Sequence, residues 1–220
     1  MNILLLGAPG SGKGSQAELL LNDYNLIQIS TGDLLRQAVS KKTEQGILAS
    51  GYMNKGELVP DELVLNILSL RLQKPDCKKG VIFDGYPRNV KQAEMLEDIL
   101  QKEGKKLDIV FNIDLPFDIV LKRLLSRRIC STCGKGYNMI SNPPKGNTCE
   151  DCGSKIITRD DDKESVIINR LEVYVENTKP LIEHYRNKGI LTDIDGNRAV
   201  PEIYGELKEI LTQKLGLKNQ

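Results

Sequence analysis

The segment NILLLGAPGSGKGSQAELLLNDY, residues 2–24, constrains the fold more than any other part of the chain. It places a glycine-rich loop between an apolar run typical of a buried strand and a pattern typical of a helix. The loop fits G-x-x-x-x-G-K from Gly7 through Gly12 to Lys13, although Gly14 stands where Ser or Thr is usual and Ser15 supplies the nearest hydroxyl. Glycines let backbone N–H groups turn toward an anion at the positive end of the following helix. The segment therefore predicts a phosphate-binding loop, with Lys13 on a β- or γ-phosphate.

Apolar runs that predict strands alternate with helical patterns along the rest of the chain. Further strands are predicted within residues 26–30, 79–88 and 107–116, and helices within residues 15–24, 31–42, 61–74, 89–102, 116–128 and 164–188. Ser30 or Thr31 is the expected cap of the helix that begins the second unit. This alternation predicts an α/β fold of the phosphate-loop (P-loop) NTPase type, in which helices flank a parallel sheet.

Two segments interrupt the alternation. Residues 40–63 are polar and punctuated by glycine, which predicts an insertion of short helical pieces, and residues 126–163 are rich in Pro, Gly, Asn and charge. Neither segment could contribute much apolar area to a central core. Both are expected to be mobile or semi-independent units over a site.

The charge balance narrows the choice of partners. Lys plus Arg total 31 and Asp plus Glu total 30, so the net charge of +1 favours neither nucleic acid nor a membrane surface. The first residues, MNILLLGAPG, lack the basic region and long apolar run of a signal peptide. We therefore expect a soluble, cytoplasmic protein, in which paired cysteines are more typical of metal sites than of disulfides.

Four of the five cysteines form two pairs, with the spacing Cys130-x₂-Cys133-x₁₅-Cys149-x₂-Cys152. This spacing predicts a four-cysteine zinc site, and because four protein ligands leave no place for water, the site is expected to be structural. Zinc would stabilise a small unit that has little core of its own, although a thiolate tetrahedron also accepts iron. A thioredoxin-like redox pair is rejected, because it needs one Cys-x-x-Cys at a helix start. Cys77 is expected to be a spare thiol in a polar turn, and the lone His184 a helix-surface residue.

Charged residues near the ends of the predicted elements indicate phosphate chemistry. Asp84 ends a predicted strand and Asp33 lies near a helix start, so either carboxylate could hold metal-bound water. Phosphoryl transfer needs positive charge around the transferring group, and arginine supplies it as a planar, permanently charged fork. Six arginines near element ends or insert boundaries are expected to converge on one phosphate chain: Arg36, Arg88, Arg123, Arg127, Arg159 and Arg170.

As a set, the motifs GAPGSGKGSQ, STGDLLR, DGYPRNVKQAE, RLLSRRIC, RDDD and NRLEVY resemble those of the adenylate kinase family, in its long bacterial-type form. The resemblance covers essentially the whole chain. It implies Mg²⁺-dependent transfer of the terminal phosphoryl group of ATP to AMP, giving two ADP, by a monomer. It also implies three parts: a core of residues 1–29, 60–125 and 164–220, an AMP-binding insert of residues 30–59, and a zinc-ribbon-like lid of residues 126–163.

The resemblance also implies the site residues. Catalytic roles fall to Lys13, Arg88, Arg127, Arg159 and Arg170. ATP would be bound by Gly10, Ser11, Gly12, Lys13, Gly14, Ser15, Arg123, Arg127, Gly136, Tyr137 and Arg198, with Arg123 against the adenine. AMP would be bound by Thr31, Arg36, Glu57, Leu58, Val59, Gly85, Tyr86, Pro87, Arg88, Gln92, Arg159 and Arg170. Arg36 and Arg88 would hold its phosphate and Gln92 its adenine edge. Asp161 and Asp162 would steady the lid arginines, and Ser141 stands where the family often has Phe, so an aromatic lid contact is lost.

Two other functions stay open at this stage. A kinase for UMP or CMP, or one with GTP as the donor, would use the same loop, but Thr31 and the zinc lid resemble the AMP enzymes. A nucleotide-switched zinc-ribbon protein could bind nucleic acid, which calls for a basic, aromatic-rich patch. Aromatic residues make up 5% of the chain and Tyr137 is the lid's only one, so we expect no nucleic-acid partner.

Overall fold

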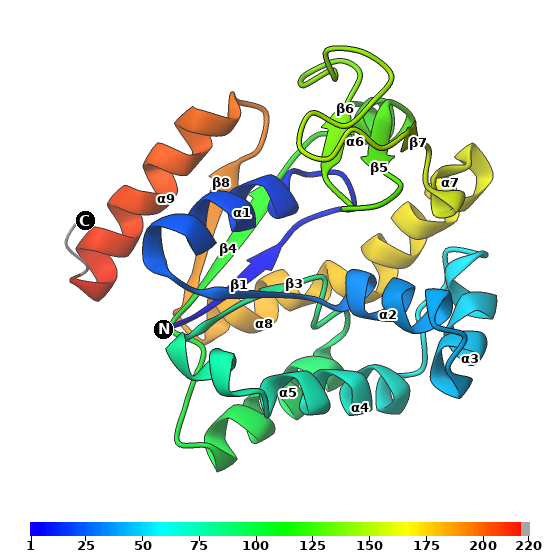
Figure 1. Ribbon diagram of the computed structural model, residues 1–220. Coiled ribbons are helices and arrows are strands. Elements are labelled where there is room, and N and C mark those ends of the chain that lie inside the picture. The colour runs from blue at the N-terminus through cyan, green and yellow to red at the C-terminus, as the bar shows by residue number, and fades with distance from the viewer. Residues whose placement is uncertain (217–220) are drawn as a thin grey trace.

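A computed structural model describes residues 1–216 and has a five-stranded parallel sheet at its centre (Figure 1). The strand order is β2-β3-β1-β4-β8, and each neighbouring pair is parallel. The strands are β1 (Asn2–Leu6), β2 (Ile27–Ser30), β3 (Val81–Asp84), β4 (Ile109–Asp114) and β8 (Leu191–Asp195). The predicted parallel α/β fold is confirmed, while the edge strand β8 was not predicted.

Helices cover both faces of this sheet (Figure 1). They are α1 (Lys13–Tyr24), α2 (Thr31–Ser40), α3 (Glu44–Met53), α4 (Asp61–Leu72), α5 (Val90–Lys102), α6 (Phe117–Leu125), α7 (Glu164–Val173), α8 (Pro180–Asn187) and α9 (Val200–Leu215). The described residues also contain short turns of helix: η1 (Pro75–Lys79), η2 (Asp160–Asp162) and η3 (Tyr174–Thr178). Among residues 1–216, none of the helices has the length and apolar character needed to cross a bilayer.

The central strand β1 contributes to two cores. Ile3 and Leu5 pack against α1 and α9, whereas Leu4 and Leu6 point to the other face and pack with residues of α2, α4, α5 and α8. All five residues of β1 are buried. A strand covered on both faces reads as a continuous apolar run, which is why NILLL was recognisable in the sequence.

The segment after α6 forms a second, smaller sheet. It contains β5 (Arg127–Cys130), β6 (Gly136–Asn138) and β7 (Ile156–Ile157), with the antiparallel order β6-β5-β7. The prediction that the preceding helix runs to Arg128 is wrong. The helix ends at Leu125, because Arg127 pairs with Asn138 in the small sheet.

The helical stretch predicted over residues 164–188 is also interrupted. A π-turn, η3, separates α7 from α8, and Pro180 begins α8. Proline has no N–H to donate and its ring clashes with the carbonyl four residues earlier, so a proline inside a helix kinks or interrupts it.

Cys77 and His184 lie in less exposed surroundings than expected. The Cys77 side chain is buried in the core, where Arg71 Nη1 donates to its Sγ at 3.0 Å, and burial raises the pKa of the thiol. His184 is half-buried, with its Nε2 3.5 Å from a Glu97 carboxylate oxygen and its ring edge-on to Tyr185. The prediction of a spare thiol in a polar turn is confirmed, since Cys77 is a free cysteine in η1, although the core buries its side chain. The helix-surface prediction for His184 is wrong, because tertiary packing covers most of its side chain.

Candidate active site

The candidate site lies where the parallel strands end. β1 leads into loop 7–12, β2 into α2, and β3 into loop 85–89, so three segments that carry predicted site residues leave the same edge of the sheet. Ligands of open parallel sheets bind at this carboxyl edge.

Loop 7–12 has the backbone of an anion site. Gly7 has a φ of 139°, and a Cβ there would lie 2.5 Å from the Ile113 carbonyl oxygen, so another residue would force the backbone to shift. Gly12, with a φ of 105°, caps α1 without a side-chain hydrogen bond, and the first turn of α1 holds no acidic residue. The N–H groups of that turn are therefore available to a phosphate.

Lys13 is held by the same loop. Its Nζ donates to the carbonyl oxygens of Gly7 and Ala8 at 2.7 and 2.8 Å. The pKa of Lys13 is lowered to about 8, mainly because the ammonium is withdrawn from water; Asp84 acts to raise it, while Arg88 and Arg170 contribute to the lowering. The ammonium thus lies among loop carbonyls and near other cations, where a bound phosphate would stabilise its charge.

The two carboxylates predicted to hold metal-bound water lie differently. Asp84 faces the start of α1, since a Cβ on Gly14 would lie 3.9 Å from its Oδ2, and that oxygen accepts a hydrogen bond from Gln28 Nε2 at 3.0 Å. Asp33 instead accepts from Arg36 Nη2 at 2.5 Å, and its side chain is 61% exposed. Asp84 is therefore the better placed of the two to act beside a phosphate on loop 7–12.

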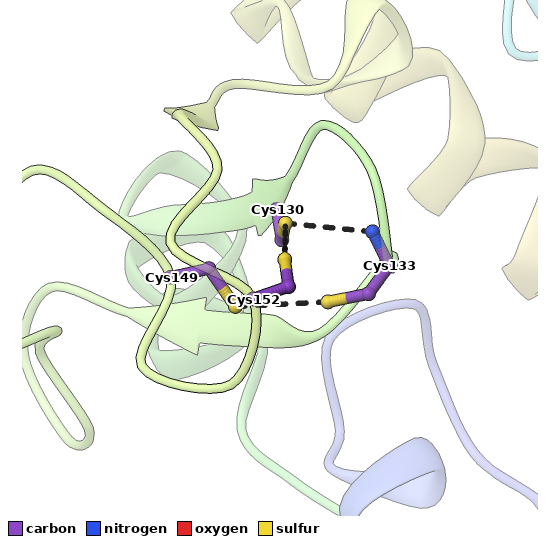
Figure 2. Close-up of side chains that lie close together, drawn as sticks. All are labelled: Cys130, Cys133, Cys149 and Cys152. Atoms are coloured by element: carbon purple, nitrogen blue, oxygen red, sulfur yellow. Dashed lines mark hydrogen bonds between the residues drawn. The ribbon is translucent and has the colours of Figure 1, made fainter.

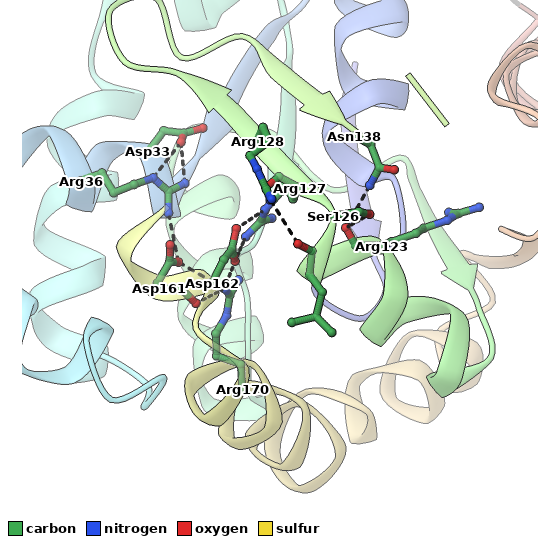
Figure 3. A network of polar contacts seen from close by, with 11 residues as sticks. Asp33, Arg36, Arg123, Ser126, Arg127, Arg128, Asn138, Asp161, Asp162 and Arg170 are labelled. Atoms are coloured by element: carbon green, nitrogen blue, oxygen red, sulfur yellow. Dashed lines mark hydrogen bonds and ion pairs between the residues drawn. The ribbon is translucent and has the colours of Figure 1, made fainter. Parts of the chain in front are cut away.

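A network of arginines and aspartates connects α2, β5, η2 and α7 (Figure 3). Arg127 Nε donates to Asp162 Oδ2 at 2.7 Å, and Arg170 Nη1 lies 3.1 Å from Asp162 Oδ1 and 3.2 Å from Asp161 Oδ2. Arg36 Nη1 lies 3.8 Å from the same Asp161 oxygen. The Asp162 side chain has no exposed surface. The structure thus brings three predicted phosphate-binding arginines together around two carboxylates.

The network leaves positive charge uncompensated. Burial lowers the pKa of Arg88 to about 10 and that of Arg159 to about 10, and neighbouring arginines act in the same direction. Although burial acts to raise the pKa of Asp161, the charges of Arg170 and Arg36 hold it below its ordinary value. The buried Nε of Arg159 has no hydrogen-bond partner among the described residues. Such a group of crowded cations favours a multiply charged anion.

A cavity beside this network holds most residues predicted to bind the phosphate acceptor. It is lined by Thr31, Gly32, Leu35, Arg36, Met53, Gly56, Glu57, Leu58, Val59, Val64, Gly85, Arg88, Gln92, Asp161 and Arg170. Tyr86 and Pro87 are buried between Gly85 and Arg88 and do not line it. Thr31 Oγ1 donates to the Gly85 carbonyl oxygen at 2.8 Å, which ties α2 to the loop after β3.

Asp61 supports the cavity and was missed by sequence reasoning. Its Oδ1 accepts from Gln92 Nε2 at 2.7 Å and from Asn89 Nδ2 at 3.0 Å. Gln92 Oε1 in turn accepts from the Arg88 N–H at 2.8 Å, so the Gln92 amide keeps one free N–H and one free lone pair for a ligand. A first-turn acid such as Asp61 is typical of any helix, so its spacing gave no signal.

Residues predicted on the other side of the site are more spread out. Arg123 bridges the phosphate loop and the turn after β8, with Nη1 3.5 Å from the Ser11 carbonyl oxygen and Nη2 3.2 Å from that of Gly196. Arg198 pairs with Glu206 and donates from Nε to the Asp195 carbonyl oxygen. The Tyr137 ring is buried in the small sheet, so only its backbone and that of exposed Gly136 remain for a nucleotide.

The four paired cysteines converge in the small sheet (Figure 2). Their sulfurs lie within 4.8 Å of one another, with Cys130–Cys152 at 3.4 Å and Cys133–Cys149 at 3.6 Å. Four sulfurs about 2.3 Å from a central zinc ion would be about 3.8 Å apart, so the donor set fits. The backbone N–H groups of residues 132 and 133 point at Cys130 Sγ, and the Tyr137 hydroxyl lowers the pKa of the Cys149 thiol. Four sulfur ligands leave no open position, which is the arrangement of a structural zinc site.

Comparison with known proteins gives one consistent result. The sequence model of a family described as "Adenylate kinase" matches residues 5–190. A curated protein named adenylate kinase from Archaeoglobus fulgidus is 50% identical over 212 residues, covering 96% of this chain and 98% of its own length. Relatives with the same name from Thermodesulfovibrio yellowstonii (49% identical, 97% of this chain and 100% of the relative) and Methanocella arvoryzae (48%, 94% and 97%) match as completely.

Proposed function

The chain belongs to the adenylate kinase family, and from that premise we propose that it transfers the terminal phosphoryl group of ATP to AMP reversibly, giving two ADP. One observation carries the proposal: a phosphate loop and a second, arginine-lined cavity open toward the same group of buried cations. A donor phosphate on the loop and an acceptor phosphate in the cavity would meet beneath Arg127, Arg159 and Arg170.

Each predicted residue has a physical role in this reaction. The N–H groups of loop 7–12 and Lys13 would bind the ATP phosphates, while Arg36 and Arg88 would hold the AMP phosphate. Arg127, Arg159 and Arg170 would stabilise the charge on the transferring group. The AMP phosphate is already an anion and needs no general base, so alignment and charge stabilisation supply the catalysis.

Metal ions have two separate places in the proposal. Mg²⁺ that arrives with ATP would supply further charge neutralisation, and Asp84, which accepts a hydrogen bond from Gln28, would bind its water. The four cysteines would hold zinc as a structural ion.

Asp161 and Asp162 would act as counterions to the site arginines before nucleotides bind. Arg36 and Arg170 both contact Asp161, and both line the acceptor cavity. An AMP phosphate would compete with this carboxylate for the same guanidinium groups. We further propose that the insert of residues 30–59 and the lid of residues 126–163 move over the core, in a monomer located in the cytoplasm.

The test is ADP formation from Mg·ATP with AMP, GMP, CMP or UMP as the acceptor. We expect strong activity with AMP alone, and a loss of about 10²- to 10³-fold in Arg88→Ala, the scale of one lost electrostatic donor. Arg186→Ala is the matched control, because within residues 1–216 Arg186 pairs only with Glu183 and Asp193 on the surface, and this variant should stay within about twofold of the parent. A pyrimidine acceptor preferred over AMP would overturn the proposed acceptor, and a near-normal rate in Arg88→Ala the proposed phosphate clamp.

A further inference from the structure

The π-turn η3 interrupts the helical segment directly before Pro180. The Lys179 N–H donates to the Tyr174 carbonyl oxygen five residues earlier at 2.9 Å, and Asn177 Nδ2 donates to the Val173 carbonyl oxygen at 3.2 Å. Pro180 cannot donate to the Glu176 carbonyl oxygen, and the turn directly before it is one residue wider than an α-helical turn. A widened turn also changes the direction in which the adjacent side chains point. π-turns of this kind are frequent at functional sites.

Thr178, the last residue of this turn, reaches across to the site. Its Oγ1 donates to the Arg88 carbonyl oxygen at 2.8 Å, although the two residues are 90 positions apart in the chain. Thr178 is half-buried, and it does not line the acceptor cavity. Its hydroxyl therefore contacts the site through the backbone of Arg88.

Side chains hold the backbone of Arg88 on both sides. Gln92 Oε1 accepts from its N–H at 2.8 Å, and Thr178 Oγ1 donates to its carbonyl oxygen. The side chain is held as well, because Arg88 Nε donates to the Gly85 carbonyl oxygen at 2.9 Å. Arg88 lies between β3 and α5, outside both elements. Its terminal nitrogens make no hydrogen bond to the described residues. The guanidinium group is therefore held in one direction while these nitrogens stay available to a ligand.

We propose that Thr178 is a positioning residue that orients Arg88 toward the acceptor phosphate, through its hydrogen bond to the Arg88 carbonyl oxygen. Thr178 touches neither nucleotide in this account, which rests on the proposed function. Without the hydroxyl, loop 85–89 would lose its link to η3, and the Arg88 fork would sample directions that do not meet the phosphate. Catalysis is sensitive to such misplacement even when the displaced group remains present.

The test compares Thr178→Val, which keeps the shape and removes the hydroxyl, with Thr178→Ser, which keeps the hydroxyl. We expect kcat/KM for AMP to fall about five- to tenfold in Thr178→Val, the scale of one lost hydrogen bond, with KM for ATP unchanged. Thr178→Ser should restore the parent value. Thr212→Val is the matched control, since Thr212 Oγ1 makes a comparable bond to the Lys208 carbonyl oxygen at 2.9 Å, within α9. If Thr178→Val does not fold, Thr178→Ala takes its place in the comparison.

Two further measurements make the inference independent of overall activity. In an Arg88→Ala background, Thr178→Val should change the AMP kinetics by less than about twofold, because the group that it orients is gone. In ¹⁵N spectra, the Arg88 Nε–H signal should shift and exchange faster with water in Thr178→Val, but not in Thr212→Val. Unchanged AMP kinetics together with an unchanged Arg88 signal would overturn the role of Thr178. If the parent protein is inactive with AMP but Thr178→Val still shifts the Arg88 signal, the proposed function is overturned and the link between Thr178 and Arg88 is not.

Discussion

Lys13 illustrates, at the scale of a single residue, how the loop predicted to bind phosphate holds its own cation. The ammonium donates to two loop carbonyls, and loss of water around it lowers its pKa to about 8. Near neutral pH the free protein therefore contains a fraction of neutral Lys13. A bound polyphosphate favours the protonated form and raises the pKa again.

This shift predicts that Mg·ATP binding takes up protons near pH 8. The free protein has about half of its Lys13 protonated at that pH and the complex nearly all, so uptake should approach about half a proton per ATP and become small at pH 6. Titration calorimetry in buffers of different ionisation enthalpy measures this quantity. Lys13→Arg is the control, because arginine keeps its charge and should take up none. Proton release at pH 8 would contradict the assignment.

The roles of single residues were predictable where they depend on the residue type itself. They were not predictable where they depend on contacts with residues from other elements. Gly7 and Gly12 were recognised because their backbone conformations need glycine. Asp61 and Gln28 matter only through side chains brought to them from other elements, so nothing in their local sequence marked them. Cys77 lies in the predicted polar turn, but the burial of its side chain was not predicted for the same reason, since the core that covers it comes from other elements.

At the scale of elements, the packing of α3 on α2 depends on a close approach at Gly46. A Cβ on Gly46 would lie 2.2 Å from the Ala38 carbonyl oxygen, closer than any real contact. Thr43 caps α3 by accepting a hydrogen bond from the Gly46 N–H. Gly46 therefore takes part both in the cap of α3 and in its close contact with α2. The insert predicted to bind AMP is therefore held by backbone contact as well as by side chains.

Gly46→Ala should destabilise this pair of helices by about 1–3 kcal/mol, because the two backbones must move apart. Gly51→Ala is the matched control on the same helix, where nothing lies within 4 Å of an added Cβ, and it should stabilise by about 0.5–1 kcal/mol. Denaturant unfolding with hydrogen exchange of α2 and α3 amides measures both. Equal changes in the free energy of unfolding for the two substitutions would show that the close backbone contact at Gly46 does not determine the packing of α3 on α2.

Elements with a strong local pattern were predicted, and those set by partners were not. β1, β3 and β4 are buried apolar runs, whereas β8 is an edge strand with the mixed sequence LTDID that, in the described part of the chain, pairs with β4 alone. α6 ends where its next residues find strand partners, and η3 exists because of Pro180. Helix periodicity alone contains neither kind of information.

At the scale of the whole molecule, we expect the small sheet β6-β5-β7 to depend on a bound metal more than the core does. Its buried cluster consists of Cys130, Tyr137 and Cys149, packed against Ile156, so two of its three members are expected zinc ligands. The core has one large apolar cluster on each face of the sheet, and neither cluster contains an expected zinc ligand. Metal binding should therefore decide the stability of one part of the protein and leave the other nearly unchanged.

Removal of zinc should unfold residues 127–157 locally and reduce activity, while the sheet stays folded. The parent should contain one zinc per chain by elemental analysis. Chelation or Cys149→Ser should accelerate hydrogen exchange in β5 and β6 and leave β4 protected. Cys77→Ala, outside the cluster, should retain the zinc. Unchanged exchange in β5 after complete metal removal would contradict a structural role.

The general plan of the molecule was predictable because its parts have separate signatures. The phosphate loop, the strand and helix alternation and the cysteine spacing each indicated one region, and the structure joins them at the carboxyl edge of one sheet. The ion pairs among Arg36, Arg127, Asp161, Asp162 and Arg170 could not be predicted in detail. They connect four elements, and their geometry follows from how those elements pack.

The central place of β1 also has a consequence for synthesis on the ribosome. β1 is the first strand of the sheet to be made, yet its neighbours begin at residues 81 and 109. Until Asp114 has been translated, an apolar strand therefore leaves the ribosome with at least one edge unpaired, the kind of segment that aggregates or is held by chaperones. Loop 7–12, which follows β1 and is predicted to bind ATP, is thus among the first parts of the candidate site to be made and among the last to be fixed in place.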